Sequence, residues 1–353
     1  WPFSGVPDEP AAWLMRVARN RALDLMRRDR TGGDTADALA HHLAIVGADP
    51  GAEQPEDTLH LLFAVADPRV GVEGAVAVVL QALAGLSARE IGLAFGLPES
   101  TVAQRLIRAK RRLREPGIGP AAPFAERLEI VLAALHAMLT EGHAPVSTDA
   151  VWRDEVAREA LRLSLLLTRI REATPAVHAL AALACFTVAR FPARADGDGA
   201  LVLLPDQERA RWDRRWIDRG FQHLQLAADG DRPSRYHFEA AIAAEHVRAA
   251  TAADTNWTGI IDLYDGLHAL VPSDAVRIHQ AVAVAMRDGA DAGLVAIERV
   301  AAAATDRSIW FHAVRAWLRE QVGDAAGARA DLAAALALDP AGPHRRLLQQ
   351  RLG

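Results

Sequence analysis

Apolar residues recur at intervals of three and four along most of the chain, which is the period of helices with one buried face. The pattern predicts two short helices, over 87–95 and 98–113, and a supporting helix over 72–84. Further helical segments are predicted over 126–139, 152–172, 175–190, 206–226 and 234–249. The sequence therefore predicts an all-α fold.

The segment Leu83–Arg114 carries the local signals of a helix-turn-helix. Ser87 and Glu90 have the spacing of a capping box, in which the hydroxyl accepts from an amide and the glutamate bonds back to the cap. Gly96 suits the left-handed conformation that ends a helix, and Pro98 suits the start of the next one. The expected apolar faces are Ile91, Leu93, Ala94 and Phe95 on the first helix, and Val102, Leu106, Ile107, Ala109 and Leu113 on the second.

The other face of the second helix is cationic. From Glu99 to Arg114 there are six basic residues and one acidic residue, whereas the whole chain has a formal net charge of −5. A concentrated basic helix displaces the counterions of a DNA duplex. A solvated basic helix is the competing interpretation, but the capping box, the glycine turn and the amphipathic pattern together favour DNA binding.

In this motif the N-terminal part of the second helix meets base edges and its flanks hold the backbone. We therefore expect a groove-facing surface made of Glu99, Ser100, Thr101, Ala103, Gln104, Arg105 and Arg108. We expect phosphate contacts from Lys110, Arg111 and Arg112.

A second amphipathic segment, Trp13–Arg28, contains Trp-Leu, then Ala-Arg-Asn, then Asp and a pair of arginines. It resembles the end of conserved region 2 in extracytoplasmic-function sigma factors of bacterial RNA polymerase. Leu83–Arg114 resembles region 4 of that family, which reads the −35 promoter element. The resemblance implies DNA contacts on the −10 side from Arg16, Arg19, Asn20, Arg27 and Arg28.

The resemblance extends to the C-terminal part of the chain. Arg211–Asp213, Ala240–Ala244 and Thr255–Trp257 are similar to motifs of a subgroup with a helical extension of tetratricopeptide-like repeats. Sigma factors also carry a stretch before the Trp-Leu pair, with the helices that grip the polymerase clamp. Because the sequence starts at Trp1, we expect this chain to lack its principal contact with the core enzyme.

Four parts are expected along the chain. Residues 1–31 form the C-terminal part of region 2, 32–55 a linker, 56–116 the region 4 domain, and 117–353 a repeat-like helical domain. Within the last part, Gly289 and Gly323 lie 34 residues apart, the period of a tetratricopeptide repeat. The residues that fit the turn, packing and terminal positions are Gly323, Ala328, Leu332, Ala335 and Pro340. A generic alanine-rich helical array is the alternative.

Composition bears on several other classes of protein. No apolar run reaches the roughly 18 residues of a membrane span, and no signal peptide is visible. The single cysteine, Cys185, is interpreted as a small buried hydrophobe. Asp196 and Asp198 fit a turn with a short hairpin better than a calcium loop. Tyr236, His237 and His246 are interpreted as packing or surface residues. We expect a cytoplasmic protein with no metal, no cofactor and no catalytic site.

The expected function is that of a sigma factor, with promoter DNA and core RNA polymerase as partners. Its C-terminal domain would regulate activity or bind a protein or a ligand. One alternative is a helix-turn-helix regulator that senses a signal through the helical domain without replacing sigma. Another is a scaffold whose repeats keep the DNA-binding segment from reaching DNA.

Overall fold

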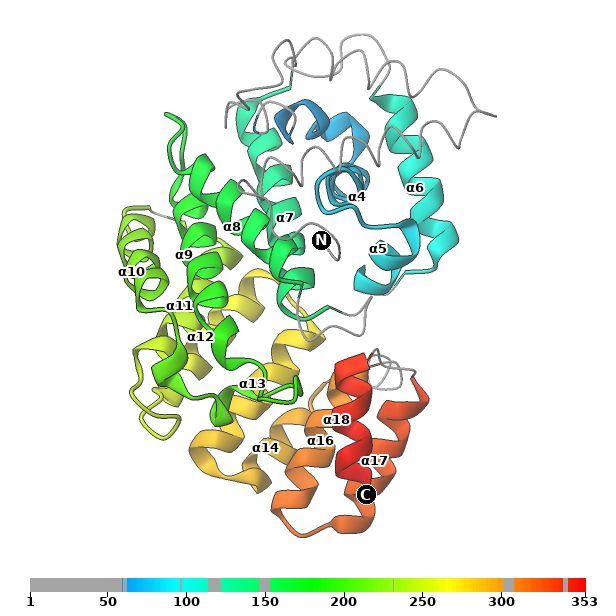
Figure 1. Ribbon diagram of the computed structural model, residues 1–353, viewed down its shortest axis with the longest axis vertical. Helices are drawn as coiled ribbons and strands as arrows, with labels where there is room; N and C mark the ends of the chain where they lie inside the picture. Colours follow the sequence, from blue (N-terminus) through cyan, green and yellow to red (C-terminus); the bar gives the residue numbers. More distant parts are fainter. Residues whose placement is uncertain are drawn as a thin grey trace. The chain divides into compact units, whose positions relative to one another are not determined.

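The computed structural model describes residue 59 and residues 62–95, 97–113, 122–145, 153–230, 232–300, 308–338 and 342–353 (Figure 1). This part of the chain is built from α-helices and short 3-10 turns, with one isolated β-bridge between Ala195 and Leu201. The prediction of an all-α fold is therefore confirmed. The chain divides into two compact units, one ending at Met138 and the other running from Leu139 to Gly353.

The first unit packs three helices around one core: α4 (Val72–Leu83), α5 (Ala88–Phe95) and α6 (Glu99–Arg112). Helix α4 is apolar on nearly every side, and its residues from Gly74 to Leu80 are buried. Helices α4 and α6 approach closely, because a Cβ atom on Gly74 would lie 3.2 Å from that of Ala109. Helix α4 is thus the support on which α6 is mounted.

Helix α7 (Phe124–His143) contains the division between the units. At its start, Phe124 stacks on Phe63 with 5.0 Å between the ring centroids, and Arg127 Nε donates to the Phe63 carbonyl at 3.0 Å. The helix expected to open the C-terminal domain therefore begins on the first unit. The compact unit extends about one helix beyond residue 116, where the sequence analysis ended the region 4 domain.

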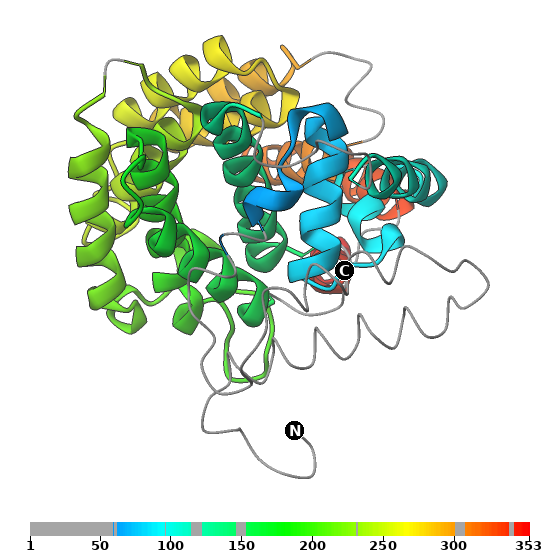
Figure 2. The same cartoon turned by 90° about the horizontal axis from the view of Figure 1, so that it is seen from above.

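The second unit is a succession of helices, most of which pack mainly on their neighbours in the sequence (Figure 2). They are α8 (Asp154–Leu167), α9 (Pro175–Ala189), α10 (Arg214–Ala227), α11 (Arg235–Arg248), α12 (Trp257–Leu270), α13 (Asp274–Asp288), α14 (Ala290–Ile297), α16 (Ile309–Gln321), α17 (Ala325–Ala337) and α18 (Gly342–Leu352). The 34-residue relation has a structural counterpart. Gly289, between α13 and α14, and Gly323, between α16 and α17, have φ of 95° and 82°, which only glycine adopts readily.

The packing positions expected around α17 are buried: Ala328, Leu332 and Ala335. Asp324 caps this helix by accepting from the Gly327 amide at 2.9 Å. The terminal position of the pattern, Pro340, lies outside the described residues.

Helix α9 packs against three helices of the second unit, α8, α10 and α11. The stretch Pro175–Ala193 is long and apolar enough to cross a membrane, but 67% of its most apolar window is buried inside the protein. A helix that is apolar on all sides is typical of a protein core. In the sequence this stretch does not read as one apolar run of that length, because Arg190 interrupts it. The expected burial of Cys185 is confirmed, and burial raises the pKa of its thiol to about 12.

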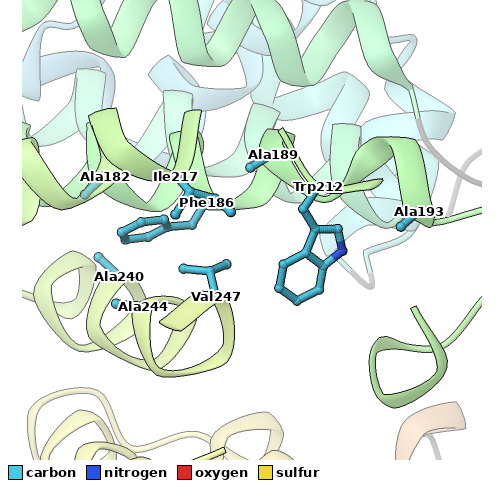
Figure 3. Close-up of a cluster of buried hydrophobic side chains, with 9 residues drawn as sticks. All are labelled: Ala182, Phe186, Ala189, Ala193, Trp212, Ile217, Ala240, Ala244 and Val247. Carbon is cyan, nitrogen blue, oxygen red and sulfur yellow. The ribbon is translucent and has the colours of Figure 1, made fainter. Parts of the chain in front are cut away.

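Figure 3 shows the core that α9 shares with α10 and α11. Phe186 lies at its centre, and Gly220 of α10 packs directly on its ring, so that any side chain at this position would overlap Phe186. Trp212 fills the end of the cluster beside Ala189 and Ala193, with its indole nitrogen directed away from Phe186.

The segment that leads into α10 differs from its prediction. A helix was expected from residue 206, but 206–213 contains the 3-10 turn Arg209–Arg211, and α10 begins at Arg214. The reason is Asp213, whose carboxylate accepts from the Arg215 amide at 3.0 Å and thereby caps α10. Before it, the short hairpin is confirmed. Asp196 Oδ1 accepts from the Ala200 amide at 2.8 Å and so stabilises the turn of this hairpin.

Candidate nucleic-acid interface

The turn between α5 and α6 is built as its sequence indicates. Ser87 Oγ accepts from the Glu90 amide at 3.2 Å, and the Ser87 amide donates to Glu90 Oε2 at 2.7 Å, which confirms the capping box. At the other end of α5, the Leu97 amide donates to the Gly92 carbonyl at 2.8 Å. Gly96 lies outside the described residues.

Gly92 is a residue of this turn that the sequence analysis missed. A Cβ atom at this position would lie 2.7 Å from the Leu97 carbonyl oxygen, closer than real Cβ contacts. Only glycine lets the chain fold back this tightly on α5. The available signal was a glycine inside a helical pattern, which often marks a close approach.

The packed face of α6 is narrower than predicted. Val102, Leu106 and Ala109 are buried, but 68% of Ile107 is exposed. A residue directly after Leu106 is turned about 100° around the helix, away from the face that rests on α4. The prediction that Ile107 belongs to the apolar stripe is therefore wrong. The same holds for Leu93 and Phe95 of α5, which are 49% and 46% exposed.

The exposed face of α6 is a mixed polar and apolar row. Ser100, Gln104, Ile107, Arg108 and Arg111 are exposed and lie opposite the packed face. Gln104, Ile107 and Arg108 line a shallow depression. Arg108 Nε donates to the Gln104 carbonyl at 3.3 Å, which holds its guanidinium along the helix. This row offers amide, guanidinium and methyl groups to an external surface.

Two of the expected contact residues are instead engaged with the protein. Arg105 is half-buried and its Nη2 lies 2.9 Å from Glu73 Oε2 of α4. Arg112 donates through Nη1 to the Arg69 carbonyl, just ahead of α4. Both contacts bind α6 to the α4 region, so these arginines help to orient the helix.

The remaining expected residues vary in exposure. Glu99 is exposed at the start of α6, while Thr101, Ala103 and Lys110 are half-buried at its flanks. Arg16, Arg19, Asn20, Arg27 and Arg28 lie outside the described residues, and their DNA contacts stay a prediction. In the part of the chain that the structure covers, no group of three His, Cys, Asp or Glu side chains is placed to hold a metal.

Comparison with known proteins gives two matches. Residues 127–228 match the family of unknown function DUF6596; these residues run from α7 to the turn after α10. An uncharacterized protein of Rhizobium meliloti (strain 1021) is 35% identical over 354 residues, covering 96% of this chain and 82% of the relative. No solved structure matches the chain.

Proposed function

The chain belongs to the same family as the uncharacterized Rhizobium meliloti protein, and we propose that its first unit binds duplex DNA through α6. The observation that carries this proposal is the exposed row from Ser100 to Arg111, which faces away from the buried face of the same helix. An α-helix fits the major groove of B-form DNA, where each base pair presents its own pattern of donors and acceptors. Helix α5, held at a fixed distance by the Gly92 turn, would then cross the backbone.

Each side chain of the row has a chemical counterpart on DNA. The Gln104 amide can form two hydrogen bonds with an adenine edge, and the Arg108 guanidinium can do so with guanine. Ile107 presents methyl groups that suit the methyl of thymine. Arg111 is placed one turn further along, where a guanidinium meets phosphates and carries no sequence information.

For the whole protein we propose a sigma-type transcription initiation factor of the cytoplasm, without enzymatic activity of its own. Two things support this: the α5–α6 geometry, and the resemblance of Trp13–Arg28 and Leu83–Arg114 to sigma regions 2 and 4 in the family's order. Promoter DNA and core polymerase would be its partners, and the second unit would regulate it.

DNA binding is tested by titrating the full-length protein against duplexes at several salt concentrations. Removing one phosphate contact with Arg111→Ala should weaken all sequences alike and lower the slope of log K against log salt by about one. Arg158→Ala is the matched control, because Arg158 is an exposed helical arginine of the second unit, paired with Asp154 at 2.7 Å. Equal slopes for wild type and Arg111→Ala would contradict the assignment.

Transcription with purified core polymerase then separates a sigma factor from a regulator. A sigma factor gives promoter-dependent transcripts when the full-length protein is the only initiation factor supplied. A regulator binds DNA in the same mixture, but transcripts form only after a separate sigma factor is added.

A further inference from the structure

Cationic side chains gather in the second unit where α9 ends. Arg194 is buried, with 7% of its surface exposed, and Arg190 is half-buried. His143, from the end of α7, lies between them: its Nε2 is 2.9 Å from Arg194 Nη1 and 3.5 Å from Arg190 Nη2. We call these three residues the α9-end cluster.

No acidic side chain of the described residues pairs with either arginine of this cluster. The Nε groups of both arginines are buried, and neither has a hydrogen-bond partner among the residues that the structure describes. The acid closest along α7, Glu141, forms an ion pair with Arg153 at 3.9 Å. Buried charges in proteins are normally paired, because desolvation without a partner is costly.

The electrostatics of the neighbourhood agree with a site of excess positive charge. Burial, followed by repulsion from Arg190, lowers the pKa of Arg194 to about 9. Burial and repulsion from Arg209 lower the pKa of Arg190 to about 10. Burial, then Arg194 and Arg190, hold the pKa of His143 well below its usual value, so the imidazole is neutral and accepts from the guanidinium.

A third buried hydrogen-bond donor lies beside the cluster. The indole Nε1 of Trp212 is buried and has no partner among the residues that the structure describes. Trp212 lies next to Ala189, the residue before Arg190, and next to Ala193, the residue before Arg194 (Figure 3). The Asp213 amide, which donates to the Ala189 carbonyl at 2.9 Å, holds this tryptophan at the end of α9.

We propose that the α9-end cluster binds a small oxyanion, a phosphate or carboxylate group, at the unpartnered Nε sides of the Arg190 and Arg194 guanidinium groups. The planar guanidinium suits two-pronged hydrogen bonding to either group. An anion would supply acceptors for the free Nε groups and neutralise the repulsion between the two arginines. Arg209 is not part of the proposed site, because Asp254 opposes the burial that lowers its pKa, so it already has an acidic neighbour.

The site lies in the second unit and does not depend on DNA binding by α6. It assigns to that unit an anionic ligand, held at the end of α9. Binding there would stabilise the end of α9 and the hairpin that follows Arg194.

Thermal unfolding of the full-length protein tests the proposal. The added salts are sodium phosphate, sodium acetate and sodium chloride at equal ionic strength. Ligand at about one hundred times its Kd should shift the unfolding equilibrium roughly 100-fold, with the midpoint rising until the site saturates. A rise with phosphate alone identifies a phosphate group, and a rise with acetate alone a carboxylate. No rise with either anion beyond that with chloride overturns the proposal.

Variants separate this site from other anion binding. Arg194→Met and Arg190→Met should each abolish the shift, whereas Arg158→Met and Arg108→Ala should retain it. An equal shift in Arg194→Met and wild type overturns the proposal, since the anion then acts elsewhere. Should Arg194→Met unfold, calorimetric titration of phosphate and acetate into wild type and Arg190→Met decides: binding in wild type alone supports the site, and any other result overturns it.

Discussion

Arg108 and Arg111 of α6 and the two arginines at the end of α9 have no acidic partner among the described residues, but their surroundings are very different. Arg108 and Arg111 are exposed, and water solvates their charge at little cost. Arg194 is 7% exposed and lies against His143, so its charge is poorly solvated. An unpaired exposed cation is ready for a large polyanion that arrives from outside. An unpaired buried cation indicates a small counter-charge that enters the fold.

Asp331 of α17 is a buried carboxylate that is paired with arginines, in contrast to the α9-end cluster. Its side chain is 3% exposed and accepts from Arg315 Nε at 2.9 Å and from Arg319 Nη1 at 2.8 Å. His312 Nδ1 lies 3.4 Å away. In the same unit, Asp331 is therefore a buried charge with several partners, whereas the α9-end cluster has no acidic partner among the described residues.

Removal of the Asp331 carboxylate should have the largest effect on stability. Asp331→Ala leaves Arg315 and Arg319 facing each other, and we expect a loss of about 3 kcal/mol in the unfolding free energy of the second unit. Urea denaturation followed by circular dichroism measures this loss. A cost under about 1 kcal/mol, the range of a surface ion pair, would remove the contrast with the α9-end cluster.

Arg108→Ala tests the role of the exposed arginines of α6. Losing a two-pronged base contact should cost about 1–3 kcal/mol on the preferred duplex, roughly 5- to 150-fold in Kd. The unfolding free energy should stay unchanged, because the guanidinium is exposed and its hydrogen bond goes to the Gln104 carbonyl of its own helix. Fluorescence anisotropy measures Kd, with Arg158→Ala as the control. An unchanged Kd would show that the exposed row of α6 does not meet bases.

Lowering the pH should weaken the second unit through its buried histidines. Burial, with repulsion from Arg190 and Arg209, lowers the pKa of His246 to about 3, and burial with His178 and Arg219 lowers that of His223 to about 4. Below the unfolded value near 6.5 the unfolded chain binds protons that the folded chain does not. Stability is therefore complete above this pH and is lost as the pH falls toward the folded values.

Between pH 7 and 5.5 we expect a loss of about 1 kcal/mol for each of these histidines. Urea titrations at the two pH values measure it. Replacing His223 by Gln should remove its share, and an unchanged pH dependence in that variant would contradict the assignment.

The smallest effect is expected at the α9-end cluster without ligand. Arg194→Met removes a buried charge that has no acidic partner among the described residues, so the second unit should gain up to about 1 kcal/mol in chloride buffer. Denaturation in chloride measures this change. A loss of more than about 2 kcal/mol would mean that an acid of the chain already pairs with Arg194.

The features that could be predicted from the sequence are those set by near neighbours. The capping box of Ser87 and Glu90, the burial of Cys185 and the helical period depend on residues within one or two turns. Ile107 was misplaced because spacing alone does not show how wide a buried face will be. The start of α10 was misplaced because Asp213 was counted inside the helix, although it caps it.

The α9-end cluster was beyond reach of the sequence for a physical reason. His143 is 47 residues from Arg190 and 51 from Arg194, and no local pattern joins them. Whether an arginine is buried depends on which helices close around it. The tie between Arg105 and Glu73 was hidden in the same way, since it depends on how α4 and α6 cross.

The central claim, that the exposed face of α6 reads DNA, is tested most directly by selecting duplexes from a random pool with full-length protein. We expect the wild type to enrich one sequence. Gln104→Ala should lose preference at one base position, by about 1–3 kcal/mol, and keep it elsewhere. Arg111→Ala should enrich the same sequence as the wild type, only more weakly. A pool without enrichment, or an unchanged preference in Gln104→Ala, would contradict the account.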